Sequence, residues 1–82
     1  MAEHDPADVE RRLREGRWVS TTELAAVFGR DRTTVYRWVV KRDLIKHRMS
    51  PGGGEVEVDP VDALRAIGDW RAGRPLTKAA ES

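Results

Sequence analysis

The chain has 82 residues, a formal net charge of +1 at neutral pH and no cysteine. This length allows one domain at most, and the lack of cysteine excludes disulfide bridges and thiolate metal sites. No stretch approaches the ~20 apolar residues of a membrane-spanning helix and no basic-then-apolar signal opens the sequence, so we expect a cytoplasmic protein without membrane partners.

The small net charge conceals a basic middle segment. Between Arg30 and Arg48 there are seven cations and two acids, a local charge of +5, and the remainder of the chain therefore carries −4. A basic segment between acidic flanks is typical of a protein that binds a polyanion. A solvated surface on an arginine-rich protein is the alternative interpretation.

Residues 1–16 predict a flexible start followed by a short helix. Asp5 is a typical N-cap, Pro6 suits the first helical position, and Gly16 suits the end. The apolar stripe of this helix is narrow, with only Val9 and Leu13. It is therefore expected either to dock on the rest of the domain or to fray.

Two more helices are expected in close succession. Ser20 and Glu23 have the spacing of a capping box, and Gly29 suits the end of that helix. Only two residues later, Asp31 can cap a helix over residues 32–42. Two helices joined by such a short, glycine-containing turn form a helix-turn-helix.

Apolar spacing predicts the buried side of the helix over residues 32–42. The predicted stripe consists of Val35, Trp38, Val39 and the stem of Arg42. Large apolar residues are few in a domain of this size, so all three tryptophans are expected to anchor the core: Trp18, Trp38 and Trp70.

Residues 45–58 switch to a period of two and predict a β-hairpin. Pairing Ser50 with Glu55 leaves residues 51–54 as the loop, and apolar and charged side chains then separate onto opposite faces. The predicted cross-strand pairs are Met49 with Val56, His47 with Val58, and Arg48 with Glu57.

The C-terminal part of the sequence predicts one helix and a tail. Asp59 and Pro60 start the helix, with Val61, Leu64 and Ile67 expected to face inward. Residues 72–82 lack periodicity and are expected to be disordered.

The side of residues 32–42 that faces away from the apolar stripe indicates a function. An α-helix fits the major groove of B-DNA, where arginine can bond guanine through two hydrogen bonds, and a helix N-terminus attracts phosphate. These properties favour DNA contact over an ordinary solvated helix. The residues on this side are Arg32, Thr33, Tyr36, Arg37 and Val40, with Lys41 beside them.

The segments "VSTTELAAVFGRDRTTVYRWVVKRDLI" and "GGGEVEVDPVDAL" resemble the winged helix-turn-helix of MerR-type regulators and phage excisionases. The likeness is carried by "ELAAVF", "TVYRW" and the glycine-rich hairpin tip, and it covers about Trp18 to Trp70. It implies a mainly α fold with a small β-hairpin, as a winged helix-turn-helix over residues 17–71. The implied function is sequence-specific binding of double-stranded DNA, by a small transcription regulator or an excisionase-like architectural factor of DNA recombination.

The resemblance also implies that the recognition helix, residues 32–42, lies in the major groove and that the wing, residues 45–58, lies near the DNA backbone. Two acids depart from the family pattern, because Glu55 and Glu57 stand where such wings commonly carry arginine. Both would repel phosphate, and Glu57 can pair with Arg48 across the strands. Charge, the exposed helix face and the resemblance together give the candidate DNA-binding residues: Arg30, Arg32, Thr33, Thr34, Tyr36, Arg37, Lys41, Arg48, Gly52, Gly53 and Gly54.

Other functional classes fit the sequence less well. An enzyme is not expected, because His4 and His47 are far apart and the "PGGG" loop lacks the Lys-Ser/Thr of a phosphate-binding loop. No cofactor or metal is expected. The alternative is a protein-interaction module whose acidic wing and first helix bind a basic partner such as an integrase or a polymerase subunit. Self-association on DNA is also expected, with the acidic segments 5–10 and 55–62 meeting the basic segment of the next copy.

Overall fold

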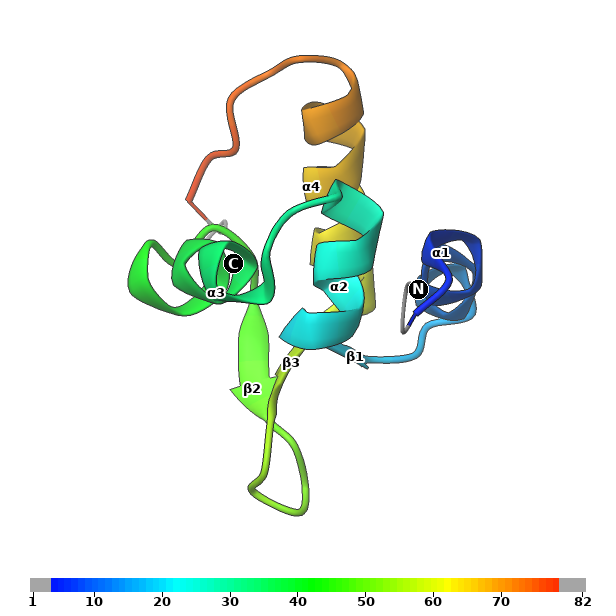
Figure 1. The fold of residues 1–82 in the computed structure, drawn as a ribbon, viewed down its shortest axis with the longest axis vertical. Helices are drawn as coiled ribbons and strands as arrows, with labels where there is room; N and C mark the ends of the chain where they lie inside the picture. Colours follow the sequence, from blue (N-terminus) through cyan, green and yellow to red (C-terminus); the bar gives the residue numbers. More distant parts are fainter. Residues whose placement is uncertain (1–3, 79–82) are drawn as a thin grey trace.

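The structure is a computed structural model that describes residues 4–78 (Figure 1). About half of the chain is helical, and a small antiparallel sheet completes a mixed, helix-rich fold, so the expected class is confirmed at this level. The described elements are α1 (Pro6–Arg14), β1 (Val19–Ser20), α2 (Thr21–Phe28), α3 (Arg32–Tyr36), the π-helical turn η1 (Arg37–Lys41), β2 (His47–Met49), β3 (Val56–Val58) and α4 (Pro60–Arg71).

The α-helices begin at the predicted capping residues. In the capping box of α2, the Glu23 N–H donates to Ser20 Oγ at 3.1 Å and the Ser20 N–H donates to Glu23 Oε1 at 3.0 Å. The carboxylates of Asp5, Asp31 and Asp59 accept backbone N–H groups at the starts of α1, α3 and α4. These local predictions are confirmed because each cap bonds within three residues of itself.

The turn between α2 and α3 depends on one glycine. Gly29 closes α2 with a φ of 65°, in the left-handed region that costs glycine little. Only Arg30 and Asp31 separate it from α3, so the connection between the two helices is very short.

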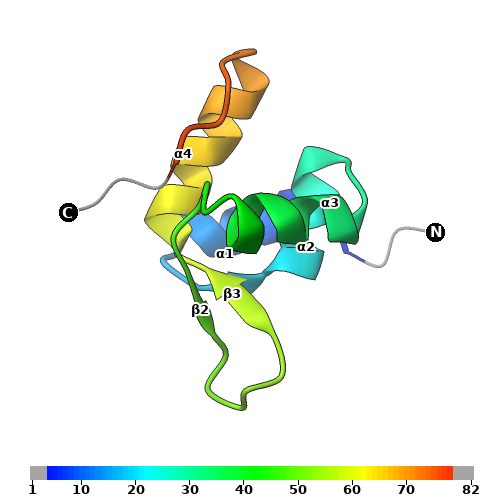
Figure 2. The ribbon, with the colours of Figure 1, turned by 90° about the vertical axis from the view of Figure 1, so that its left-hand side faces the viewer.

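The predicted hairpin register is confirmed, and the sheet has one strand more than expected. His47 pairs with Val58, Arg48 with Glu57 and Met49 with Val56, and the Ser50 N–H donates to the Glu55 carbonyl at 2.7 Å across the loop. The additional strand is β1, which pairs antiparallel with β3 to give the order β1-β3-β2. The loop end of the hairpin projects beyond the helices (Figures 1 and 2).

Helix α1 packs into the same core as the rest of the domain. The predicted division between residues 1–16 and residues 17–71 therefore does not separate α1 from the core. Val9 and Leu13 are each 1% exposed, which settles the alternative between docking and fraying in favour of docking. The core contains residues of all four α-helices, of η1, of the strands β1 and β3, and of the loop between η1 and β2. Its members are Val9, Leu13, Val19, Leu24, Ala25, Phe28, Val35, Val39, Leu44, Ile45, Val58, Ala63, Ala66 and Ile67.

Three expectations about burial are wrong. Arg42 is exposed, because the chain widens into η1, where the Arg42 N–H donates to the Arg37 carbonyl at 2.9 Å, and the α-helical phase of the stripe is lost. Val61 is 76% exposed, since the first turn of α4 buries Ala63 instead. Val40, expected on the exposed side of residues 32–42, is half-buried and packs against the core. The expectation for the tryptophans holds in part, because all three are half-buried and Trp38 and Trp70 pack against the core.

The segment after α4 folds back on the domain. It has no regular secondary structure over 74–78, but Leu76 packs against the core and Arg74 Nε lies 3.0 Å from Asp69 Oδ1. Figure 1 shows this segment turning back from the end of α4, and its residues line a hollow with Trp38, Arg42 and Leu44 of η1 and the loop that follows. The expectation of disorder over 72–82 is therefore corrected for residues 72–78, and residues 79–82 and 1–3 lie outside the described part of the chain.

Candidate nucleic-acid interface

Ion pairing divides the arginines of the chain into two groups. Within residues 4–78, eight arginines lie within 4.0 Å of a carboxylate oxygen. Those that form no such pair are Arg30, Arg32, Arg37 and Arg42, and all of them fall in one stretch of thirteen residues around α3 and η1. The exposed Lys41 adds a fifth cation there. We call Arg30, Arg32, Arg37, Lys41 and Arg42 the basic block.

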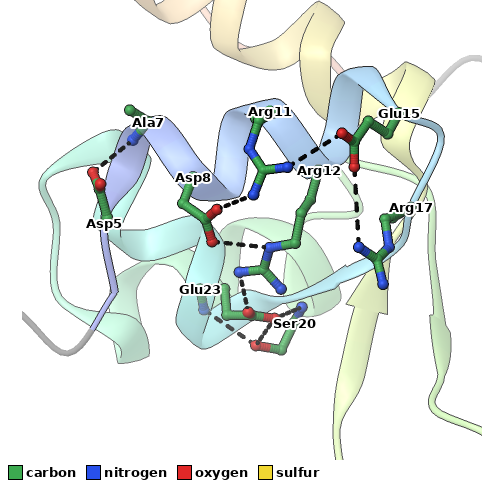
Figure 3. Close-up of polar contacts among 9 residues, drawn as sticks. All are labelled: Asp5, Ala7, Asp8, Arg11, Arg12, Glu15, Arg17, Ser20 and Glu23. Carbon is green, nitrogen blue, oxygen red and sulfur yellow. Dashed lines mark hydrogen bonds and ion pairs between the residues drawn. The ribbon is translucent and has the colours of Figure 1, made fainter.

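The arginines around α1 show the opposite behaviour (Figure 3). Asp8 lies between Arg11 and Arg12, and Arg12 also reaches Glu23 on α2. The hydrogen bond from Arg11 holds the pKa of Asp8 below its ordinary value, with further help from nearby guanidinium charges. Positive and negative charges are matched in this region, so it offers little net charge to an external partner.

The exposed face of α3 carries most of the residues that the sequence singled out. Arg32, Thr33, Tyr36 and Arg37 are exposed, whereas Thr34 is half-buried. The backbone N–H groups of Thr33 and Thr34 both donate to Asp31 Oδ2, at 3.1 and 3.3 Å. Because a carboxylate already holds these donors, the start of this helix attracts phosphate less than the sequence suggested, and contact depends on the side chains.

The turn η1 changes where the end of the basic block points. A π-helical turn holds one residue more than an α-helical turn, so the side chains after Arg37 depart from α-helical positions. Arg30, at the other end of the block, packs its guanidinium over the ring of Trp70, 5.4 Å from the centroid. The block is therefore presented by three consecutive geometries: the turn after α2, the helix α3 and the wide turn η1.

Two hollows adjoin the exposed face of α3, and both include the side chain of Tyr36. The first has a volume of about 190 Å³ and is lined by Thr21, Thr22, Arg32, Thr33 and Tyr36. The second has a volume of about 280 Å³ and is lined by Thr21, Thr22, Tyr36, Met49, Gly54, Glu55 and Val56. We call the two together the helix–wing groove, since it runs from α3 past the start of α2 to the hairpin.

Sequence reasoning missed four lining residues of this groove: Thr21, Thr22, Met49 and Val56. The two threonines follow the capping serine of α2, where hydroxyl side chains are common for local reasons. Met49 and Val56 alternate with charged residues, which is the pattern of any hairpin with a buried face. Their meeting with Tyr36 depends on tertiary structure, so no local signal could have identified them.

The structure does not bring Arg48 to the groove. Successive side chains on a strand point to opposite faces, and its neighbour Met49 lines the groove. Arg48 lies instead over the ring of Trp18, 3.9 Å from the centroid, with its Nε 3.3 Å from Glu57 Oε1. The predicted pairing with Glu57 is confirmed, and it leaves Arg48 on the face of the hairpin that points away from Tyr36.

The wing glycines occupy the loop and its base. Gly52 and Gly53 are exposed at the loop, and Gly54 lines the helix–wing groove. The Gly53 N–H donates to the Ser50 carbonyl at 2.7 Å and the Gly54 N–H to Ser50 Oγ at 3.2 Å. These donors are therefore used inside the loop, and Gly54 contributes close approach rather than a free N–H.

The two wing acids occupy different faces, which gives a prediction. Glu55 lines the groove beside the basic block, whereas Glu57 is held by Arg48 on the other face. Glu55→Gln is expected to tighten binding of duplex DNA about threefold, because it removes a negative charge near the phosphates. Glu57→Gln is the matched control and should change the Kd less. Fluorescence-anisotropy titration measures both, and equal effects would show that the groove is not nearer to DNA than the opposite face.

No protein-family model, curated protein or solved structure matches this chain. Over residues 4–78, no helix is both long and apolar enough to cross a membrane. The same residues contain no group of three or more His, Cys, Asp or Glu side chains that could hold a metal ion.

Proposed function

We propose that the protein binds double-stranded DNA as a winged helix-turn-helix module. In this arrangement α2 and α3 form the helix-turn-helix, the segment 32–42 enters the major groove, and the β2–β3 hairpin is the wing. The biological role that we propose is the one implied by the sequence resemblance: the protein acts as a small transcription regulator or as an excisionase-like architectural factor.

One observation carries the proposal: the arginines without a carboxylate partner in the described chain are confined to the basic block. Because the other arginines of the described chain are paired with carboxylates, unpaired arginine charge is concentrated in this segment, and the phosphate backbone of DNA is a polyanion that such a segment attracts. The same segment exposes the hydroxyl-bearing side chains of Thr33 and Tyr36, and such groups bond phosphates and base edges. A solvated surface would not require the unpaired arginines to gather in one segment.

Titration of duplex DNA in a gel-shift assay at increasing salt tests the proposal. Because binding releases counterions from the duplex, affinity should fall steeply as salt rises, and the logarithmic slope should reflect the number of phosphates contacted. Binding that is absent at low salt would refute the proposal.

Arg37 is expected to contribute sequence specificity. It is exposed in the middle of segment 32–42 and has no carboxylate partner among residues 4–78, so its guanidinium is free to bond a guanine through two hydrogen bonds. Arg37→Ala should weaken binding to a selected site by about 1–2 kcal/mol, with a smaller effect on random duplex. Arg17→Ala is the matched control, since it removes the same charge from an exposed side chain outside the basic block. Equal losses on selected and random duplex would assign Arg37 to phosphate contact instead.

The alternative function, binding of a basic protein through the acidic first helix and wing, has less support. Asp8 and Glu10 on α1 are paired with arginines of the same molecule, and so are Glu57 and Asp62. The charge that would attract an integrase or polymerase subunit is thus largely neutralised inside the protein.

The expected self-association on DNA also has less support, because it required the same acidic side chains to contact the basic segment of the next copy. Of the two wing acids, Glu55 forms no ion pair with an arginine or lysine within residues 4–78, and it lines a hollow that Arg32 also lines. Sedimentation of the free protein, followed by footprinting over a titration, tests whether copies spread along neighbouring sites.

A further inference from the structure

We infer that the helix–wing groove holds one sugar–phosphate strand of the duplex, with phosphate at the Thr21–Thr22–Arg32 side and deoxyribose against Tyr36 and Met49. This inference rests on the proposed function and assigns a role to residues that the sequence did not single out. It also separates contact with the backbone, in the groove, from contact with bases, on the outer face of segment 32–42.

The polar wall of the groove has unused hydrogen-bonding capacity. Thr21 is only 7% exposed, yet it lines both hollows, and its hydroxyl is not among the buried polar atoms of the described chain that lack a partner, so what remains exposed of this residue opens into the groove. Thr22 lies beside it, and Arg32 adds a guanidinium without a carboxylate partner among residues 4–78. Two threonine side chains and a guanidinium that lacks a carboxylate partner line one hollow together, and hydroxyl and guanidinium donors of this kind suit an anionic ligand with acceptor oxygens.

The other wall of the groove, next to the hairpin, is lined by apolar side chains. Large apolar side chains are exposed at three places in the described structure, at Tyr36 (41%), Met49 (58%) and Val61 (76%). Two of the three, Tyr36 and Met49, line the same hollow from different elements, with Val56 and the open space beside Gly54 completing it. Exposed apolar groups that converge in this way indicate a binding surface.

A DNA strand presents both characters in alternation, since anionic phosphates are joined by sugars with apolar faces. A strand therefore satisfies both walls, which a free anion or an apolar peptide would not. The groove is continuous with the exposed face of α3, because Arg32, Thr33 and Tyr36 belong to both. When α3 enters the major groove of DNA, the sugar–phosphate strand at the edge of that major groove would lie in the helix–wing groove of the protein.

The main test places a negative charge in the polar wall. Thr22 is the second residue of α2, where an acidic side chain is favourable for the helix, so Thr22→Glu should leave the fold intact. It should weaken binding of an oligonucleotide duplex about tenfold or more through repulsion of the phosphate. The matched control is Val61→Glu, which adds the same charge at the second residue of α4, on an exposed side chain that does not line the groove.

A chemical change in the DNA then locates the contact. Single methylphosphonate linkages, which remove the charge of one phosphate, are moved through each strand of the duplex. Binding by Thr22→Glu should recover at one or two neighbouring positions of one strand and be unaffected elsewhere. Thermal unfolding of both variants verifies that the comparison is between folded proteins.

The apolar wall is tested separately. Met49→Ala should weaken binding about fivefold through lost contact with the sugar, whereas Val61→Ala, at the most exposed apolar side chain, should leave the Kd unchanged.

The outcomes distinguish the two proposals. If the wild-type protein binds duplex DNA but Thr22→Glu behaves like Val61→Glu, or no methylphosphonate restores its binding, then the strand does not lie in the groove and the DNA-binding proposal stands. If Thr22→Glu is impaired but Met49→Ala behaves like Val61→Ala, the assignment of the sugar to Met49 is wrong. If the wild-type protein binds no duplex, both proposals fail.

Discussion

Trp38→Ala is expected to lower the free energy of unfolding by about 3–4 kcal/mol. Its indole ring lies edge-on to Phe28, with centroids 5.6 Å apart, and 5.3 Å from Trp70, so these three rings connect α2, η1 and α4. The expected loss is in the lower part of the range for tryptophan truncation because the ring is half-buried. A domain of this size has little stability to spare, so part of the variant population should be unfolded at 37 °C.

Urea denaturation followed by circular dichroism measures this loss. Tyr36→Ala is the matched control, because it removes an aromatic ring from the same helical segment but from a side chain that is 41% exposed, and it should cost far less stability. A Trp38→Ala protein with wild-type stability and weakened DNA binding would contradict the structural role and indicate that the indole stacks on DNA.

Glu10→Gln is expected to cost about 2–3 kcal/mol of stability. Glu10 is 8% exposed, and its two carboxylate oxygens accept hydrogen bonds from Arg71 Nη1 and Nη2, each at 2.7 Å, with Arg14 Nη2 also 2.7 Å away. This contact joins α1 to the end of α4. Glutamine has one acceptor oxygen and no charge, so it leaves part of the guanidinium unpaired and buries an amide without its full set of partners.

The effect should depend on pH. The hydrogen bond from Arg71 lowers the pKa of Glu10 below its ordinary value of 4.5, aided by the charges of Arg71 and Arg14 and opposed by burial. Because the folded-state pKa is the lower one, this stabilisation is fully present above pH 4.5 and is lost as the pH falls through the folded-state pKa. The stability difference between wild type and Glu10→Gln should therefore be largest near neutral pH and shrink in acid.

Urea denaturation at neutral pH and at several acidic values measures this dependence. Glu15→Gln is the control, since Glu15 pairs with Arg11 and Arg17 on an exposed surface, where such pairs contribute little. A constant Glu10→Gln difference across the pH range would show that the carboxylate charge does not stabilise the fold.

Features of the fold that depend on neighbours in sequence could be predicted. The caps at Ser20, Asp31 and Asp59 each bond within three residues, and the hairpin register follows from alternation of apolar and charged side chains. The two-residue strand β1 could not be predicted, because it has no period and exists only through pairing with β3. The wide turn η1 was equally unpredictable, since the spacing of its apolar residues fits an α-helical pattern.

The candidate site divides in the same way. The exposed face of α3 follows from helical spacing, and Arg32, Thr33, Tyr36 and Arg37 lie exposed as predicted. Arg48 was expected to contact DNA because the hairpin resembles a wing, and only the tertiary structure reveals that its face of the hairpin is not the one beside Tyr36. The groove residues Thr21 and Met49 meet Tyr36 from elements far apart in sequence, so only the tertiary structure reveals them.

The closeness of Trp38 and Trp70 has an optical consequence. Indole rings whose centroids are 5.3 Å apart and whose planes are inclined by 48° couple their electronic transitions, and such coupling produces paired positive and negative bands in circular dichroism. The two chromophores belong to η1 and α4, so this couplet reports whether those elements are docked, independently of helix content. The protein thus carries an intrinsic, label-free signal for tertiary assembly.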